Sequence, residues 1–297
     1  MLATGNQVGL TMDRIILATD FTPTSEAATR YAEAFAKRFS SNLTLAHVVD
    51  LSIATRSEKA VVGVPLDDMR RLDNIAMEQL LKEFSRSGVK ATGHALEAHN
   101  PAAAIVGLAD QLKVDLIVAG THARHGVSKA ILGSCAEGII RHATCPVLTV
   151  GPKANYPSGG KFSLNAIVFA TDFDAEAAAK ASFALAFAQD NEAKIYLCHI
   201  LEASGKDIAQ TLEWRLKTET ALQKMIPESV YDWCSPECIV EQGKAAAHIL
   251  ALARRVNADL IVLGAKRRYS WLVPWNNGVV GEVLAEAECP VMTICAA

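Results

Sequence analysis

Short apolar runs rich in β-branched residues alternate along this chain with longer segments whose apolar residues are spaced three or four apart. The runs are typical of buried parallel strands, and the longer segments are typical of helices packed on a sheet. Strands alternating with helices predict right-handed βαβ units and a doubly wound parallel sheet, the α/β class. In the first half, the pattern predicts strands at residues 15–18, 43–49, 92–97, 116–119 and 146–150. The predicted helices run from Pro23, after a Thr22 cap, to residue 39, over 67–85, from Asn100-Pro101 onward, and over 134–142.

The same pattern then starts again, which indicates an internal duplication. A segment dense in Pro, Gly, Ser and Asn separates the copies, so we expect domains at residues 1–151 and 162–297 with a linker at 152–161. Four blocks match in order: IILATDF with IVFATDF and LAHV with LCHI at an offset of 152, then DLIVAG with DLIVLG and CPVLTV with CPVMTI at an offset of 144. The second copy is therefore 152 − 144 = 8 residues shorter between its second and fourth strands.

Composition narrows the classes of protein to consider. The 297 residues are 51% hydrophobic with a formal net charge of −3, which favours a large core and argues against a nucleic-acid partner. The N-terminus resembles no signal peptide, and no apolar run is long enough to span a membrane, so we expect a cytoplasmic protein. The seven cysteines are interpreted as reduced core thiols, because their number is odd and several lie beside strand-like runs. The one close pair, Cys234 and Cys238, has neither the spacing nor the second pair of a zinc site.

Residues 114–134 carry the most distinctive polar pattern. An apolar strand ends at Gly120, a polar loop with His122, Arg124, His125 and Lys129 follows, and Gly133-Ser134 begin a helix. Glycine lets a backbone approach an anion, Ser supplies a hydroxyl, and a helix N-terminus offers unpaired N–H groups. The stretch therefore predicts a phosphate site, although it matches neither GxxxxGK[ST] nor GxGxxG.

The spacing Gly120-x2-Ala123-x9-Gly133-Ser134 resembles the G-x2-G-x9-G-[S/T] nucleotide loop of the universal stress protein family, with Ala123 in place of the second glycine. The resemblance covers almost the whole chain. It implies two tandem five-stranded, adenine nucleotide alpha hydrolase-like domains that pair through their last strands, and it leaves a homodimer open. It also implies ATP, or AMP or ADP, with Mg²⁺ in the first domain. The implied nucleotide-binding residues are Ala18, Asp20, Val48, Gly120, His122, Ala123, Arg124, Gly133, Ser134 and Cys135.

Asp20 and Asp172 directly follow the first strand of each copy, at the edge where ligands bind in open α/β sheets. Either the carboxylate contacts a ligand or it interacts with the dipole of the next helix. The family resemblance favours the ligand for Asp20: it implies that this carboxylate contacts adenine and that the backbone at Val48 holds the other edge of the base. His47 and His199 recur inside apolar strands, and we interpret them as packed, hydrogen-bonded core residues.

The second copy departs from this pattern in its loop. Arg267 stands where a small residue is expected, and Asn277-Gly278 stand where Gly133-Ser134 would fall at the 144 offset, so the hydroxyl is lost. Trp271, Pro274 and Trp275 add bulk. We therefore expect that the second domain does not bind ATP in the usual way and serves to pair with the first.

Three functions remain open from the sequence. The first is a stress-response protein whose nucleotide reports on energy or stress state. The second is an enzyme, a slow ATPase or a nucleotidyl transferase, but the loop lacks the Walker-type lysine and acidic partner that hydrolysis would use, so the sequence leans against catalysis. The third is a non-nucleotide scaffold or a binder of an apolar metabolite.

Overall fold

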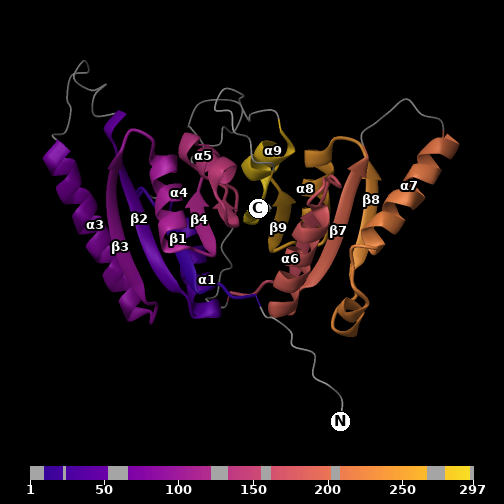
Figure 1. The fold of residues 1–297 in the computed structure, drawn as a ribbon, viewed down its shortest axis with the longest axis horizontal. Coiled ribbons are helices and arrows are strands. Elements are labelled where there is room, and N and C mark those ends of the chain that lie inside the picture. The colour runs from indigo at the N-terminus through magenta and orange to yellow at the C-terminus, as the bar shows by residue number, and fades with distance from the viewer. Residues whose placement is uncertain are drawn as a thin grey trace, which may run out of the picture.

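The structure, a computed structural model, describes residues 10–22, 25–52, 66–121, 133–154, 162–201, 208–265 and 278–294. In these residues the strands form one sheet with the order β3-β2-β1-β4-β5-β10-β9-β6-β7-β8 (Figure 1). The strands of the first half are β1 (Arg14–Ala18), β2 (Asn42–Asp50), β3 (Ala91–Ala98), β4 (Leu116–Gly120) and β5 (Val147–Val150). Those of the second half are β6 (Ala166–Ala170), β7 (Lys194–Leu201), β8 (Glu237–Gln242), β9 (Leu260–Gly264) and β10 (Val291–Ile294). Within each half every pairing is parallel, as the apolar runs predicted.

Helices cover both faces of the sheet. The first half contains α1 (Glu26–Phe39), α3 (Leu66–Arg86), α4 (Pro101–Leu112) and α5 (Ser134–His142). The second contains α6 (Ala177–Asp190), α7 (Ile208–Gln223), α8 (Ala245–Arg255) and α9 (Val279–Glu286), with a 3₁₀ turn at Glu228–Asp232. In Figure 1, α3 and α7 lie at the two outer ends of the molecule.

Each face of the sheet carries one core that runs through both halves. Along β1, Ile15 and Leu17 pack against the core formed with α1, α3, α6 and α7, whereas Ile16 and Ala18 pack against the core formed with α4, α5, α8 and α9. The alternation follows from the two-residue period of a strand, and because both faces are covered, β1 reads as continuously apolar. This is the doubly wound arrangement that the sequence predicted.

The halves meet at their last strands, as predicted. β5 and β10 pair antiparallel, and Leu148 lies opposite Met292, the residue at its own position in the other copy. Phe35 of α1 likewise stacks on its counterpart Phe187 of α6, with ring centroids 6.0 Å apart and an interplanar angle of 15°. Pairing of a residue with its own counterpart is expected at an approximate two-fold axis. The two five-stranded sheets are therefore continuous as one sheet of ten.

Strand register locates the length difference between the copies. Thr44 pairs with Thr92 in the first half, and Tyr196 pairs with Glu237 in the second. The offset at the third strand is thus 237 − 92 = 145, so seven of the eight missing residues precede that strand. The shortening falls almost wholly in the connection that contains α3 in one copy and α7 in the other.

The start of α1 differs from the prediction. The helix begins at Glu26 with Ser25 as its N-cap, and not after a Thr22 cap. The reason lies in the preceding turn: the Thr22 amide and hydroxyl both donate to Asp20 Oδ1, and the Thr22 carbonyl accepts the Ser25 amide. Thr22 is therefore a turn residue. Pro23 lies outside the described residues. The predicted cap of α4 is confirmed, since Asn100 Oδ1 accepts the Ala103 amide at 3.1 Å.

Candidate functional site

Four of the predicted site residues lie where the strands of the first half have their carboxyl ends, which we call the first edge; the second edge is the same place in the second half. Ala18 pairs with Ala119 of β4 and Ala46 of β2, so the carboxyl ends of these strands lie side by side. Asp20, Val48 and Gly120 lie one or two residues further along. The strand order reverses between β1 and β4, which is the point where open α/β sheets bind ligands.

A strained turn presents Asp20 at this edge. Phe21 has φ = 57°, a left-handed conformation uncommon for a bulky residue. The Thr19 hydroxyl accepts the Phe21 amide at 3.1 Å and so stabilises the turn. The exposed Asp20 carboxylate binds Thr22, ahead of α1, so its local role is in the turn and not in the first turn of the helix.

The turn repeats in the second half. Phe173 has φ = 56°, and its amide donates to the Thr171 hydroxyl at 3.1 Å. Backbone strain of this kind costs on the order of 1–3 kcal/mol and persists where the surroundings enforce it. Its recurrence means that the Thr-Asp-Phe geometry is shared by both edges.

His47 is a packed, hydrogen-bonded residue, as predicted. It is 7% exposed, its Nδ1 lies 2.9 Å from the Thr19 carbonyl oxygen, and the Phe21 ring packs against it at a tilt of 32°, with ring centroids 4.8 Å apart. Its Nε2 lies 3.1 Å from Asp73 Oδ2. The sequence did not predict the role of Asp73, because no local pattern indicates which strand residue a carboxylate on α3 contacts. His199 repeats the first contact, with Nδ1 at 2.7 Å from the Thr171 carbonyl oxygen.

The N-terminus of α5 completes the described part of the first edge. Gly133 is its N-cap and Ser134 its first residue, with an exposed side chain. Burial raises the pKa of the Cys135 thiol to about 11, and the charges of Asp20 and Asp50 add to the shift, so these carboxylates are close enough to act on the start of α5 electrostatically. Gly133 has φ and ψ of −60° and 141°, an extended conformation that any residue adopts.

The middle of the first loop lies outside the described residues, and with it His122, Ala123, Arg124, His125 and Lys129. In the second loop the same holds for Arg267, Trp271, Pro274, Trp275 and Asn277.

The second edge differs where the nucleotide loop would end. The N-cap of α9 is Gly278 and that of α5 is Gly133, so the offset between the two helix starts is 145. The C-caps of the same helices are Ala287 and Ala143, so the offset between their ends is 144. The helix is thus one residue shorter, and Val279 and Val280 occupy the first turn where α5 has Ser134 and Cys135.

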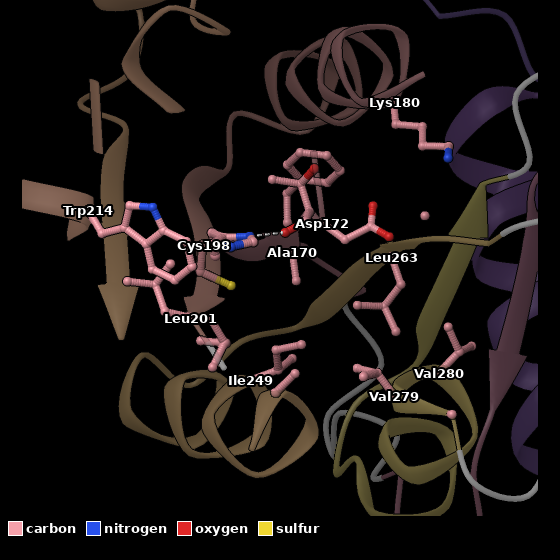
Figure 2. A pocket seen from close by; sticks show the side chains of 17 residues that line it. Ala170, Asp172, Lys180, Cys198, Leu201, Trp214, Ile249, Leu263, Val279 and Val280 are labelled. Carbon is pink, nitrogen blue, oxygen red and sulfur yellow. Dashed lines mark hydrogen bonds between the residues drawn. The ribbon is translucent and has the colours of Figure 1, made fainter. Parts of the chain in front are cut away.

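A cavity of about 630 Å³ opens at this second edge, among the ends of β6, β7 and β9. Figure 2 shows Asp172 and Lys180 on one side of it, and Ile249, Val279 and Val280 on the opposite side. The cavity was not predicted. Its one sequence signal is Lys180, a lone cation on the buried face of an otherwise apolar helix.

Lys180 is 3% exposed and forms ion pairs with Asp174 at 2.6 Å and Glu176 at 3.3 Å. Burial alone would lower the pKa of its ammonium, but the hydrogen bond to Asp174 and the charges of both carboxylates outweigh burial and raise the pKa. At an offset of 152, the corresponding residues of the first half are Ala28, Thr22 and Thr24. The whole ion-paired cluster therefore belongs to the second half alone.

The six cysteines in the described part of the chain are free thiols, while Cys295 lies beyond it. Those residues contain no cluster of three or more histidine, cysteine or acidic side chains arranged to bind a metal. None of the helices they form is both long and apolar enough to cross a membrane.

Comparisons with known proteins agree with the duplicated fold. The model of the universal stress protein family matches residues 11–151 and again residues 164–294. A universal stress protein of Methanocaldococcus jannaschii is 33% identical over 145 residues, which cover 46% of this chain and 81% of that protein. A putative universal stress protein of Staphylococcus haemolyticus is 36% identical over 146 residues, or 48% of this chain and 86% of that one.

A solved structure extends the likeness over both halves. The crystal structure of a universal stress protein from Archaeoglobus fulgidus superposes with a TM-score of 0.72 and 17% identity, covering 96% of this chain and 97% of that one. At that identity the likeness concerns the fold alone. With the family model matched twice and the sheet order repeated in each half, the chain belongs to the universal stress protein family as a tandem member with two such domains.

Proposed function

We propose that residues 1–151 bind ATP, or AMP or ADP, and that the protein acts in the cytoplasm as a sensor or regulatory module of a stress response. The observation that carries this proposal is the edge where Asp20, Gly120 and the first turn of α5 converge. That edge offers a hydroxyl, a helix N-terminus and a carboxylate around the switch point of the sheet, which suits a phosphorylated nucleoside.

Each group has a distinct role in the proposed site. The Ser134 hydroxyl and the unpaired N–H groups of the first turn of α5 would bind phosphate oxygens, aided by the helix dipole. The Asp20 carboxylate would accept a hydrogen bond from the adenine amine, and the backbone at Val48 would bind the adjoining edge of the base. His122, Ala123 and Arg124 would complete the phosphate loop.

Magnesium would enter with the nucleotide. Mg²⁺ is commonly held by one or two carboxylates together with substrate phosphates and water. Asp50, at the carboxyl end of β2, would be the carboxylate for this role, because Asp20 is assigned to the base. Its task would be to orient the metal against the phosphates.

We propose one nucleotide per chain. Residues 162–297 keep the Asp172 turn but have valines in the first turn of α9, so no hydroxyl stands where Ser134 does. A valine side chain cannot bind a phosphate oxygen, and it narrows the approach to the helix N-terminus. The second domain would instead pair with the first through β10 and α6.

Isothermal titration of the full chain with Mg-ATP tests the proposal, with Gly133→Val as the key variant. Gly133 has an extended backbone that valine adopts without strain, so the variant should fold while its branched side chain blocks close approach of a phosphate. The matched control is Gly278→Val, the N-cap of α9 with φ and ψ of −96° and 153°.

We expect one ATP per chain, loss of binding in Gly133→Val, and unchanged binding in Gly278→Val. The reverse pattern would place the nucleotide in the second half. Unchanged affinity in both variants would show that the phosphates bind away from these helix N-termini and would refute the proposed site.

A further inference from the structure

The cavity at the second edge has walls that are mostly apolar. Cys198, Ile200 and Leu201 of β7 line it together with Ile249 of α8 and Leu263 of β9. Burial raises the pKa of the Cys198 thiol to about 12, so this side chain is a neutral, weakly polar part of the wall. A volume near 630 Å³ falls within the range of roughly 300–1,000 Å³ typical of small-molecule sites.

The matched positions of the first half indicate how the second edge has changed. At an offset of 152, Cys198, Ile200 and Leu201 replace Ala46, Val48 and Val49, each a gain in apolar volume or polarisability. Trp214 of α7 adds a large ring at the side of the cavity (Figure 2). The second edge therefore offers more apolar contact than the first.

The charged residues that line the cavity lie at one end of it. Asp172 and Lys180 line that end, and Lys180 is already paired with Asp174 and Glu176. The charge of the ammonium is therefore compensated within the protein. The lysine stem lies against the end of β9, since a Cβ added to Gly264 would be 3.0 Å from Lys180 Cδ.

Ionised ligands are disfavoured in this cavity. An anion would meet the Asp172 carboxylate and a lysine whose charge is already compensated. A cation would lose its hydration against walls that are mostly apolar, which is costly for a charged group. A neutral group avoids both costs and still finds a hydrogen-bonding partner at the Asp172 end, because a carboxylate accepts at about four lone-pair positions.

We propose that this second-half cavity binds a neutral, largely apolar small molecule with one hydrogen-bonding head group. The apolar body lies against Ile249, Leu263 and the first turn of α9, and the head group lies at the Asp172 end. The site is independent of the nucleotide proposed for the first half, and both are occupied at once.

Two fluorescent probes that differ by one charge test this. N-phenyl-1-naphthylamine is neutral, and 1-anilinonaphthalene-8-sulfonate is the same ring system with an added sulfonate. Both are titrated into the full chain with saturating Mg-ATP present. We expect one neutral probe per chain, bound at least about tenfold more tightly than the sulfonate, which corresponds to roughly 1.4 kcal/mol.

Two variants locate the bound probe. Val279→Glu puts a charge on the cavity wall at a residue that is 40% exposed, and glutamate suits the first turn of a helix, so the fold should persist. Leu216→Glu is the control, because Leu216 is 60% exposed on α7 and does not line the cavity. We expect Val279→Glu to weaken the neutral probe by about tenfold or more and Leu216→Glu to leave it unchanged.

Several results would overturn the inference: no binding of the neutral probe, tighter binding of the sulfonate, or equal affinity of wild type and Val279→Glu. Displacement of the probe by raising the ATP concentration would also overturn it, because nucleotide and probe would then share one site. A chain that binds no ATP but keeps the probe would refute the proposed function and leave this inference standing.

Discussion

Truncation of the aromatic pair between the halves should destabilise both halves together. Phe35 and Phe187 are each 0% exposed and stack on one another across the approximate two-fold axis. Loss of a buried Phe side chain to alanine costs about 3–5 kcal/mol of unfolding free energy, from lost transfer and the cavity left behind. A stacked pair adds about 0.5–1.5 kcal/mol of coupling. We therefore expect Phe35→Ala and Phe187→Ala to cost 3–5 kcal/mol each, and the double variant to cost about 0.5–1.5 kcal/mol less than their sum.

The distribution of tryptophan makes the assay specific for one half. All four tryptophans of the chain, Trp214, Trp233, Trp271 and Trp275, belong to the second copy. In guanidinium unfolding, tryptophan fluorescence therefore reports the second half, whereas far-UV circular dichroism reports both. Because the sheet and both cores are continuous, Phe35→Ala in the first half should shift the two transitions equally.

Phe84→Ala is the control for the coupling. Phe84 is 2% exposed and belongs to α3 at the outer end of the first half. Phe84→Ala should therefore lower the free energy of unfolding by as much as Phe35→Ala, but its effect should add to that of Phe187→Ala with no coupling energy. A fluorescence midpoint that stays at the wild-type value in Phe35→Ala, while the dichroism midpoint falls, would refute the argument. The halves would then unfold independently in spite of the shared sheet.

Two further predictions concern single sites. Gly151→Ala should lower the free energy of unfolding by about 1–3 kcal/mol, as measured by thermal unfolding, since the added Cβ would lie 2.6 Å from the Leu284 carbonyl oxygen of α9. Gly107→Ala, with nothing within 4 Å of the added Cβ, should instead gain about 0.5–1 kcal/mol, and equal effects would contradict the close contact. Because burial raises the pKa of Cys135 to about 11, peptide-resolved iodoacetamide labelling should be slow at pH 8, where only ~0.1% is thiolate, and rise about tenfold per pH unit toward pH 10. Rapid labelling at pH 8 in the folded chain would contradict it.

Most of the fold follows from the chain's apolar pattern. Each predicted strand of the first half is found within a residue or two of its expected bounds, because a strand covered on both faces must be continuously apolar. The pairing of β5 with β10 came from the family resemblance, since periodicity does not specify which edge strands meet. The predicted start of α1 was wrong. Thr22 followed by Pro23 is typical of a helix N-terminus, but Thr22 instead donates to Asp20 in the preceding turn, and Ser25 is the N-cap.

The candidate site was predictable only in part. Asp20 and Gly120 are found at one edge because parallel strands place their carboxyl ends together. The contact of His47 with Asp73 joins two elements far apart in sequence, and no local pattern encodes it. Lys180 is an unusual residue in an apolar helix, but acidic residues such as its partners Asp174 and Glu176 are common at helix N-termini, so the sequence does not indicate the ion pairs.

The two copies also act as controls for one another. The Thr-Asp-Phe turn has nearly the same backbone geometry in both halves, with φ of 57° and 56° at the phenylalanine, and in each half a histidine ring packs against that phenylalanine, with centroids 4.8 and 4.9 Å apart. Only one half keeps a hydroxyl at the next helix N-terminus. The turn is therefore a property of the sheet edge, and its presence alone does not distinguish a nucleotide site. Ligand choice must instead depend on residues that differ, among them Ser134 against Val279 and Ala28 against Lys180. Exchange of those residues, and not of the shared aspartates, is the change that should move nucleotide binding from one half to the other.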